Sequence, residues 1–229
     1  MNRAEKLEFL EEKWIQILKE ENLWWEHDGD MTRPHALLTS GLHSGGFANV
    51  KKVIHDKNLR IELAANLISL MSRTAGLGPD WQDKPPPPAI FGPATSATLL
   101  AREMAGMLGC GWGYAEKDPE NPERMNLRGY EVSRNDKGIW VIEDVITTGT
   151  TVVRTIKSIL SYGGSVENYI LCTLNRSGYE RVTRSREMIL ALINRKWLVF
   201  TQEECSLCRA GSQAIRPKNP PENWAKLTS

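Results

Sequence analysis

The chain has 229 residues, of which 41% are hydrophobic and 25% are charged, as in an ordinary globular protein of one domain or one domain with appendages. Its formal net charge of +1 excludes a global field that would steer the whole chain to nucleic acid or to a membrane surface. The charged N-terminus has no apolar core, and no run of about 18 apolar residues occurs. We therefore expect no signal peptide, no membrane span, and a cytoplasmic protein with reduced thiols.

The first predicted elements are a helix and a glycine-rich hairpin. Apolar residues recur at spacings of three and four over residues 2–21 and predict an amphipathic helix. Strands are predicted over Ala36–Leu38 and Ala48–Ile54, joined by a tight connection with the sequence TSGLHSGG. Leu59–Ser72 then has helical periodicity.

The middle of the chain alternates between strand and helix patterns. Prolines in residues 75–88 predict an extended connection into a short strand, Ala89–Phe91. The next predicted elements are, in order, a helix over Thr95–Leu108, a strand over Gly111–Ala115, a polar loop over Glu116–Asn126 and a short strand over Gly129–Val132.

The clearest unit is a strand, a helix and a strand over Gly138–Ile142, Gly149–Tyr162 and Val166–Leu174. Such crossovers make parallel sheets, so the chain predicts an open α/β sheet with a small N-terminal appendage. A helix over Ser185–Asn194 and a strand over Trp197–Phe200 are expected next, followed by a peripheral tail.

The chemistry concentrates in Val141–Thr151, where an apolar strand leads into two adjacent acids, Glu143 and Asp144. The hydroxyl-rich run Thr147–Thr151 follows and opens a helix, whose first N–H groups and dipole suit a phosphate. The acids would repel that phosphate but suit neighbouring sugar hydroxyls or a metal. Together these groups describe a site for a ribose 5-phosphate. A merely capped helix is the alternative, and the paired acids make it the weaker one.

This segment closely resembles the motif by which type I phosphoribosyltransferases bind phosphoribosyl pyrophosphate (PRPP). The resemblance implies an α/β fold: an open, mainly parallel twisted sheet with helices on both faces and a small N-terminal hood. It also implies Mg²⁺ as cofactor and a homodimer. The residues assigned to PRPP are Glu143, Asp144, Val145, Ile146, Thr147, Thr148, Gly149, Thr150, Thr151, Ala94, Thr95, Ser96, Ala97, Lys117 and Arg124, and those assigned to catalysis are Asp144, Glu143 and Lys117.

Three further segments are similar to the orotate-using branch of the family, in the expected order. Ser40–Asn49 is similar to the hairpin that lines the base pocket, Gly92–Ala97 to the pyrophosphate loop, and Leu174–Arg176 to the segment whose arginine contacts the orotate carboxylate. The resemblance thus implies transfer of a phosphoribosyl group from PRPP to a nucleobase, orotate, in pyrimidine biosynthesis. It assigns the base to Phe47, His43 and Arg176, although a turn role for His43 stays open.

The departures from the family pattern keep two alternatives open. In the family a mobile lysine-rich loop with a histidine closes over PRPP, whereas residues 116–128 retain only Lys117, and Glu116 stands where an arginine is usual. Asn175 replaces the usual aspartate. The alternatives are a transferase for another base and a catalytically weak PRPP-binding regulator. No helix-turn-helix pattern or basic stripe occurs, so we expect no nucleic-acid partner.

We expect three regions: an N-terminal helix and hood over 1–55, a core over 56–203, and a tail over 204–229. The tail holds a CxxC sequence, Cys205-Ser206-Leu207-Cys208, and these cysteines are candidate zinc ligands. Zinc would need two more ligands, for example from a partner chain, because all four histidines precede residue 56. A simple pair of tail thiols is the favoured reading.

Overall fold

The structure is a computed structural model that describes residues 3–74, 85–93, 95–121, 123–182 and 185–228. The chain divides into two compact units: Met1–Glu11 with Val50–Arg195, and Glu12–Asn49 with Lys196–Ser229. This division differs from the sequence-based boundaries after residues 55 and 203, because strands of the C-terminal region pair with strands of the N-terminal region.

The first unit contains a six-stranded sheet with the strand order β10-β9-β8-β5-β6-β7. All neighbours pair in parallel except β7, which is an antiparallel edge strand. The strands are β5 (Ala89–Pro93), β6 (Gly111–Lys117), β7 (Met125–Arg128), β8 (Ile139–Ile146), β9 (Val166–Asn175) and β10 (Met188–Asn194). The helices are α2 (Val50–His55), α3 (Lys57–Thr74), α4 (Ser96–Leu108) and α5 (Thr150–Ser161).

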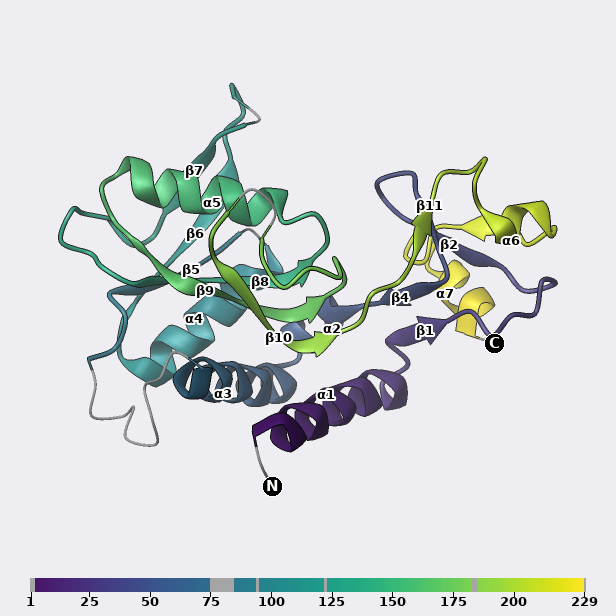
Figure 1. Ribbon diagram of the computed structural model, residues 1–229, viewed down its shortest axis with the longest axis horizontal. Helices are drawn as coiled ribbons and strands as arrows, with labels where there is room; N and C mark the ends of the chain where they lie inside the picture. The colour runs from purple at the N-terminus through teal and green to yellow at the C-terminus, as the bar shows by residue number, and fades with distance from the viewer. Residues whose placement is uncertain (1–2, 75–84, 94, 122, 183–184, 229) are drawn as a thin grey trace. The chain divides into compact units, whose positions relative to one another are not determined.

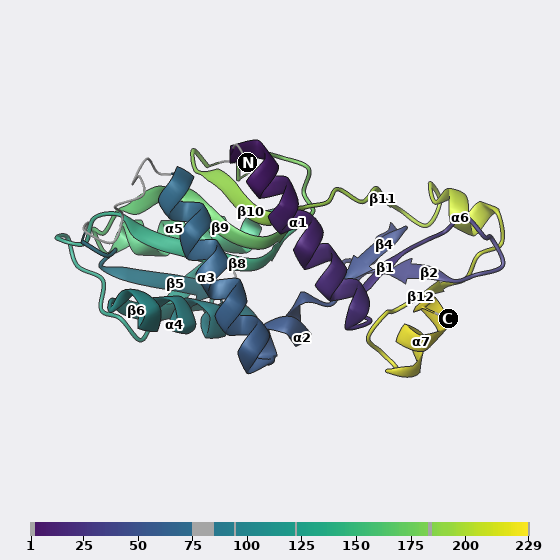
Figure 2. The same ribbon diagram turned by 90° about the horizontal axis from the view of Figure 1, so that it is seen from below.

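Helices cover both faces of this sheet. In Figure 1, α5 lies on one face and α3 and α4 on the other, and the view from below in Figure 2 places α3 and α4 in front of the strands. Strand β8 is therefore buried on both sides, which explains its continuous apolar start, Ile139–Ile142. The apolar side of α5 packs against the sheet through Val152, Ile156 and Ile159. The predicted α/β fold with helices on both faces is confirmed.

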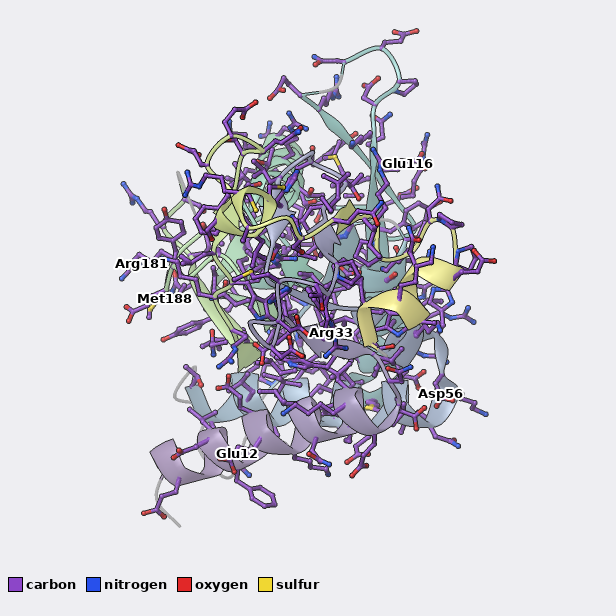
Figure 3. The ribbon with its side chains drawn as sticks, turned by 90° about the vertical axis from the view of Figure 1, so that its right-hand side faces the viewer. Glu12, Arg33, Asp56, Glu116, Arg181 and Met188 are labelled. Atoms are coloured by element: carbon purple, nitrogen blue, oxygen red, sulfur yellow. The ribbon has the colours of Figure 1, made fainter. Side chains whose placement is uncertain are left out.

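Two elements were predicted in the wrong class. Ser185–Asn194 was expected to be helical, but its apolar part is strand β10, which pairs with β9 along its length. An isolated bridge between Arg181 and Met188 marks the start of β10, at one edge in Figure 3. Ala48–Ile54 was expected to be a strand, but Val50 begins helix α2. Short apolar runs carry too little periodicity to decide between these classes.

The segment after β6 was also predicted incorrectly. We expected a polar loop over Glu116–Asn126 and a strand over Gly129–Val132. Instead β6 extends to Lys117, and β7 pairs with it as a hairpin in which Lys117 lies opposite Met125. Gly129, with φ of 87°, lies just beyond β7. Most of the predicted connection over 75–88 lies outside the described residues.

The second unit is built around short strands whose pairs are antiparallel, except for the parallel pair of β12 and β2. β1 (Trp24–Glu26) pairs with β4 (Gly46–Ala48), and a four-stranded sheet has the order β11-β3-β2-β12. Its strands are β2 (His35–Leu37), β3 (His43–Ser44), β11 (Val199–Phe200) and β12 (Ala214–Ile215), and its helices are α6 (Ser206–Arg209) and α7 (Glu222–Thr228). Helix α1 (Arg3–Glu20) begins in the first unit and ends in the second.

The sequence predicted a peripheral tail, and this prediction was wrong. Leu227 is fully buried and Ile215 is 9% exposed, and both pack with Trp25 and Ala36 in the core of the second unit. The tail therefore completes the fold of the N-terminal hood. None of the helices in the described part of the chain has the length and hydrophobicity that a membrane crossing requires.

Candidate active site

The two adjacent acids lie within β8 near its carboxyl end. The Glu143 side chain is buried, and its residue pairs with Cys172 of β9. The backbone N–H of Asp144 donates to Oε1 of Glu143 at 3.1 Å, and the N–H of Val145 donates to Oδ1 of Asp144 at 2.7 Å. Burial, and secondly the charge of Asp144, raises the pKa of Glu143 well above its usual value. Burial thus favours the protonated form of Glu143 more than it is favoured in an exposed glutamate.

A tight turn joins the acids to helix α5. Gly149 has φ of 75°, in the left-handed region that favours glycine, and it caps α5 without a side-chain hydrogen bond. The hydroxyl oxygens of Thr148 and Thr150 are 3.0 Å apart. The first amides of α5 have no partners within the helix and lie beside these hydroxyls. Such a turn can hold a phosphate.

A cavity of about 530 Å³ opens at this turn. Its lining residues are Glu123, Thr147, Thr148, Thr150, Val153, Arg154, Lys157 and Tyr179. Arg154 forms an ion pair with Glu123, yet its buried Nε has no hydrogen-bond partner among the described residues. Because buried guanidinium N–H groups are normally paired, this one suits an anionic ligand.

Arg154 and Lys157 are absent from the sequence-based site. They follow Thr150 by four and seven positions, which places all three on one side of α5. That spacing was the available signal. It adds two cations to the candidate phosphate-binding turn Thr147–Thr151, called the cradle below.

A second helix start lies at the carboxyl end of the neighbouring strand. Strand β5 pairs in parallel with β8 and leads into α4 at Ser96. A Cβ on Gly92 would lie 2.5 Å from the carbonyl oxygen of Ala97, so this close turn requires glycine. Thr95 caps α4 without a side-chain hydrogen bond, which leaves the first amides of the helix available. Ala94, also predicted to bind PRPP, lies outside the described residues.

The remaining cations of the predicted PRPP site lie on the β6–β7 hairpin. Lys117 ends β6 and is exposed, and Arg124 immediately precedes β7, where its carbonyl accepts a hydrogen bond from the N–H of Asp118 at 3.1 Å. Glu116, which is labelled in Figure 3, forms an ion pair with Arg128, and the Arg128 Nε lies 2.8 Å from the Glu116 Oε1. The hairpin belongs to β6, the strand beside β5.

Ile146 and Arg176 meet through the backbone at the ends of β8 and β9. The N–H of Arg176 donates to the carbonyl of Ile146 at 3.0 Å, and burial lowers the pKa of Arg176. The buried Asn175 side chain donates to the carbonyl of Tyr179 at 2.9 Å and accepts from the hydroxyl of Ser177 at 2.6 Å. The asparagine therefore holds the turn that carries Arg176.

The three residues predicted to bind the base lie in different units. Arg176 belongs to the first unit, and Phe47 and His43 belong to the second. The Phe47 ring contacts Trp224, with centroids 5.8 Å apart, and the ammonium of Lys218 lies 5.2 Å from its centroid. His43 is 4% exposed. The base-binding role of all three remains a prediction.

His43 also lies in a cluster with His35, Cys205 and Cys208, whose nitrogen and sulfur atoms all lie within 4.8 Å of one another. Burial, with smaller effects of His43 and His27, lowers the pKa of His35 to about 4, so its ring is neutral at pH 7. The two partners that the CxxC sequence lacked are thus present in the same chain.

Known proteins resemble this chain in both sequence and structure, although no family model matches it. An orotate phosphoribosyltransferase of Campylobacter hominis is 30% identical over 208 residues, which cover 86% of this chain and 96% of the relative. One from Nitratiruptor sp. is 26% identical over 204 residues, covering 84% and 95%.

Solved structures agree at the level of the fold. The crystal structure of orotate phosphoribosyltransferase from Aeropyrum pernix has a TM-score of 0.60 at 20% identity and covers 79% of this chain and 92% of that chain. The Mycobacterium tuberculosis enzyme has a TM-score of 0.57 at 15% identity, covering 81% and 95%. Because the chain is 30% identical to a relative that it covers along nearly the relative's whole length, it belongs to the orotate phosphoribosyltransferase family.

Proposed function

We propose that this protein transfers the phosphoribosyl group of PRPP to orotate, giving a nucleoside 5′-monophosphate and pyrophosphate. The observation that supports this most is the acid pair of β8, followed directly by the cavity at the start of α5, in a chain of the orotate phosphoribosyltransferase family. The cavity offers hydroxyls and two cations to the 5′-phosphate. The acids offer acceptors to the ribose hydroxyls.

In the proposed reaction a ring nitrogen of the base bonds to C1 of the ribose while the bond from C1 to the pyrophosphate oxygen breaks. Positive charge grows on the ribose and negative charge on the leaving pyrophosphate, so positioning and electrostatics carry the catalysis. Asp144 fixes the ribose through its hydroxyls. The amides of Thr95–Ala97 and the ammonium of Lys117 face the pyrophosphate. Closure of the β6–β7 hairpin tip excludes water.

Mg²⁺ is the proposed cofactor. Glu143 and Asp144 are consecutive acids near the end of β8, and oxygen donors are what Mg²⁺ prefers. Bound mainly through PRPP, the ion would offset the negative charge of the pyrophosphate. We further propose a homodimer in the cytoplasm, on family resemblance alone, which sedimentation and cell fractionation would test.

A second candidate is the same chemistry on another base. It is favoured by the environment of His43, whose Nδ1 lies 3.0 Å from His35 Nε2 and 3.2 Å from Cys208 Sγ. If these contacts keep the His43 imidazole out of the base pocket, that pocket differs from the one that the family resemblance implies and would select a different base.

The test is an assay of the purified protein with PRPP, Mg²⁺ and orotate, in which orotate absorbance and pyrophosphate release are followed together. The proposal predicts equal consumption and release. If neither changes while PRPP still raises the melting temperature, the protein binds PRPP but uses another base or none. A panel of bases then separates a transferase of different specificity from a PRPP-binding regulator.

A further inference from the structure

We propose that His35, His43, Cys205 and Cys208 form a structural zinc site in the second unit. Their four ligand atoms lie within 4.8 Å of one another, although at least 162 residues (from 43 to 205) separate the histidine pair from the cysteine pair in sequence. Three of the four side chains are buried and Cys208 is half-buried. Two thiolates and two imidazoles are a donor set that selects zinc among the common metals.

Four of the six distances between the ligand atoms are close to those around one tetrahedral ion. Zinc bonds of about 2.3 Å to sulfur and about 2.0–2.1 Å to nitrogen imply ligand atoms about 3.3–3.8 Å apart. His35 Nε2 lies 3.6 Å from Cys205 Sγ and 3.5 Å from Cys208 Sγ. His43 Nδ1 lies 3.2 Å from Cys208 Sγ and 3.0 Å from His35 Nε2. Shifts of a few tenths of an ångström would bring these four distances to the values expected for a tetrahedral ion.

The backbone holds the ligands from two sides. His35 and His43 are diagonal neighbours on the paired strands β2 and β3, so their side chains point to the same face of the sheet. The two cysteines flank the start of the short helix α6, in the connection between the edge strands β11 and β12. Both edge strands pair with the histidine strands, which fixes the position of the connection over the histidines.

Ser212 determines which nitrogen of His35 faces the cluster. The Ser212 hydroxyl donates its one proton to the carbonyl of Arg33 at 2.6 Å, so it can only accept from His35 Nδ1, 2.8 Å away. Nδ1 therefore carries the proton, and Nε2 presents its lone pair toward both cysteines. This is the outer-shell arrangement found around metal-bound histidines.

Other readings of the cluster explain less. Cys205 and Cys208 are free thiols, so no disulfide joins them. A hydrogen-bond network alone would leave two buried imidazoles and two thiols converging without a common partner. The second unit is also small, at about 70 residues, a size at which metals commonly supplement a limited core. With all four positions filled by protein, the site is structural.

The test begins with the metal content of the purified full-length protein, expressed without added metal and measured by mass spectrometry. The proposal predicts about one zinc per chain, and loss of that zinc in His35→Ala and Cys208→Ser. The matched controls His55→Ala and Cys110→Ser alter a histidine and a cysteine outside the cluster and should retain it. Wild-type protein that contains no zinc and takes up none from solution overturns the proposal, as does bound iron in its place.

Two measurements avoid variants that fail to fold. Wild-type protein reconstituted with Co²⁺ should show the visible absorption and thiolate charge-transfer bands of tetrahedral cobalt, and a spectrum of octahedral cobalt without charge transfer contradicts the site. Ser212→Ala keeps every ligand but removes the acceptor for His35 Nδ1. It should weaken zinc binding about 10–100-fold in competition with a chelator. Unchanged zinc affinity removes Ser212 from the proposal.

Discussion

The backbone N–H of Asp144 donates a hydrogen bond to Oε1 of Glu143 at 3.1 Å. This bond links the two neighbouring acids of β8 in the ligand-free protein. Their environments differ: Glu143 is buried and Asp144 is half-buried. The more accessible Asp144 is suited to meet a ribose hydroxyl, whereas burial of Glu143 carries a cost in stability that a bound ligand can offset. These differences predict different results for the two substitutions.

Replacing Asp144 by asparagine should lower kcat by about 100-fold or more, the loss typical when an electrostatic contact to the transition state is removed. The melting temperature should change little, because the side chain is not part of the core. Steady-state kinetics and thermal melts check both statements. Glu167→Gln alters an acid at the opposite end of the adjacent strand β9 and should leave kcat unchanged. Near-wild-type turnover in Asp144→Asn would exclude it from the mechanism.

Replacing Glu143 by glutamine should stabilise the ligand-free protein in a pH-dependent way. An unfolded glutamate loses its proton near pH 4.5, whereas burial and the charge of Asp144 raise the pKa of Glu143 in the folded protein. As pH rises above 4.5, the free energy of unfolding of the wild-type protein therefore falls. The advantage of Glu143→Gln in melting temperature should grow between pH 5 and the raised pKa, and PRPP binding should weaken. An advantage independent of pH contradicts this account.

Asp136 provides a control, because its pKa is shifted in the opposite direction to that of Glu143. Burial acts to raise the pKa of the Asp136 carboxyl group. Hydrogen bonds from the Ser133 backbone N–H at 2.6 Å and from the Tyr130 hydroxyl at 2.8 Å outweigh burial, so the pKa of Asp136 is lowered. Its contribution to stability is present above the unfolded pKa of 3.8 and is lost as pH falls through the lower folded value. Asp136→Asn should therefore lower the melting temperature at pH 7, with less effect in strong acid.

Lys157→Ala should raise the KM for PRPP about tenfold and change kcat less, because it removes one charge-assisted contact to the phosphate. Lys157 lines the cavity at the start of α5. The matched control is Lys137→Ala, an exposed lysine that precedes the amino end of β8. Equal KM values for Lys157→Ala and the wild type would show that the phosphate does not reach this side of the cavity.

Asn175→Asp restores the residue usual in the family but should destabilise this protein by about 1–3 kcal/mol. A carboxylate cannot donate to the carbonyl of Tyr179 or to Oδ1 of Asn194, as the amide does at 2.9 and 3.2 Å. Chemical denaturation measures the change in the free energy of unfolding. An equally stable variant would mean that the turn that carries Arg176 does not depend on these two hydrogen bonds.

The sequence predicted the strand–helix–strand unit that holds the acids and the cradle, because long periodic segments and a specific motif coincide there. The class of β10 could not be predicted, since its apolar run becomes a strand only by pairing with β9. For α2 a signal existed: Val50, Val53 and Ile54 have helical spacing, although β-branched residues favour strands.

The cluster in the second unit was only half predictable. The spacing of Cys205 and Cys208 marked one pair of ligands, but His35 and His43 join them only through the pairing of β12 with β2 and β11 with β3. No local pattern encodes contacts across such a distance in sequence. Arg154 is a different case: its spacing from Thr150 on α5 was a local signal, and its unpaired Nε beside the cradle supports that signal.

The most direct test of orotate as the acceptor compares kcat/KM for orotate with that for a panel of other nucleobases, measured by pyrophosphate release from PRPP in the presence of Mg²⁺. Orotate should give the highest value, and pyrophosphate release should depend on Asp144. A higher value for another base, or no release with any base while PRPP still binds, would contradict the assignment of orotate as the acceptor.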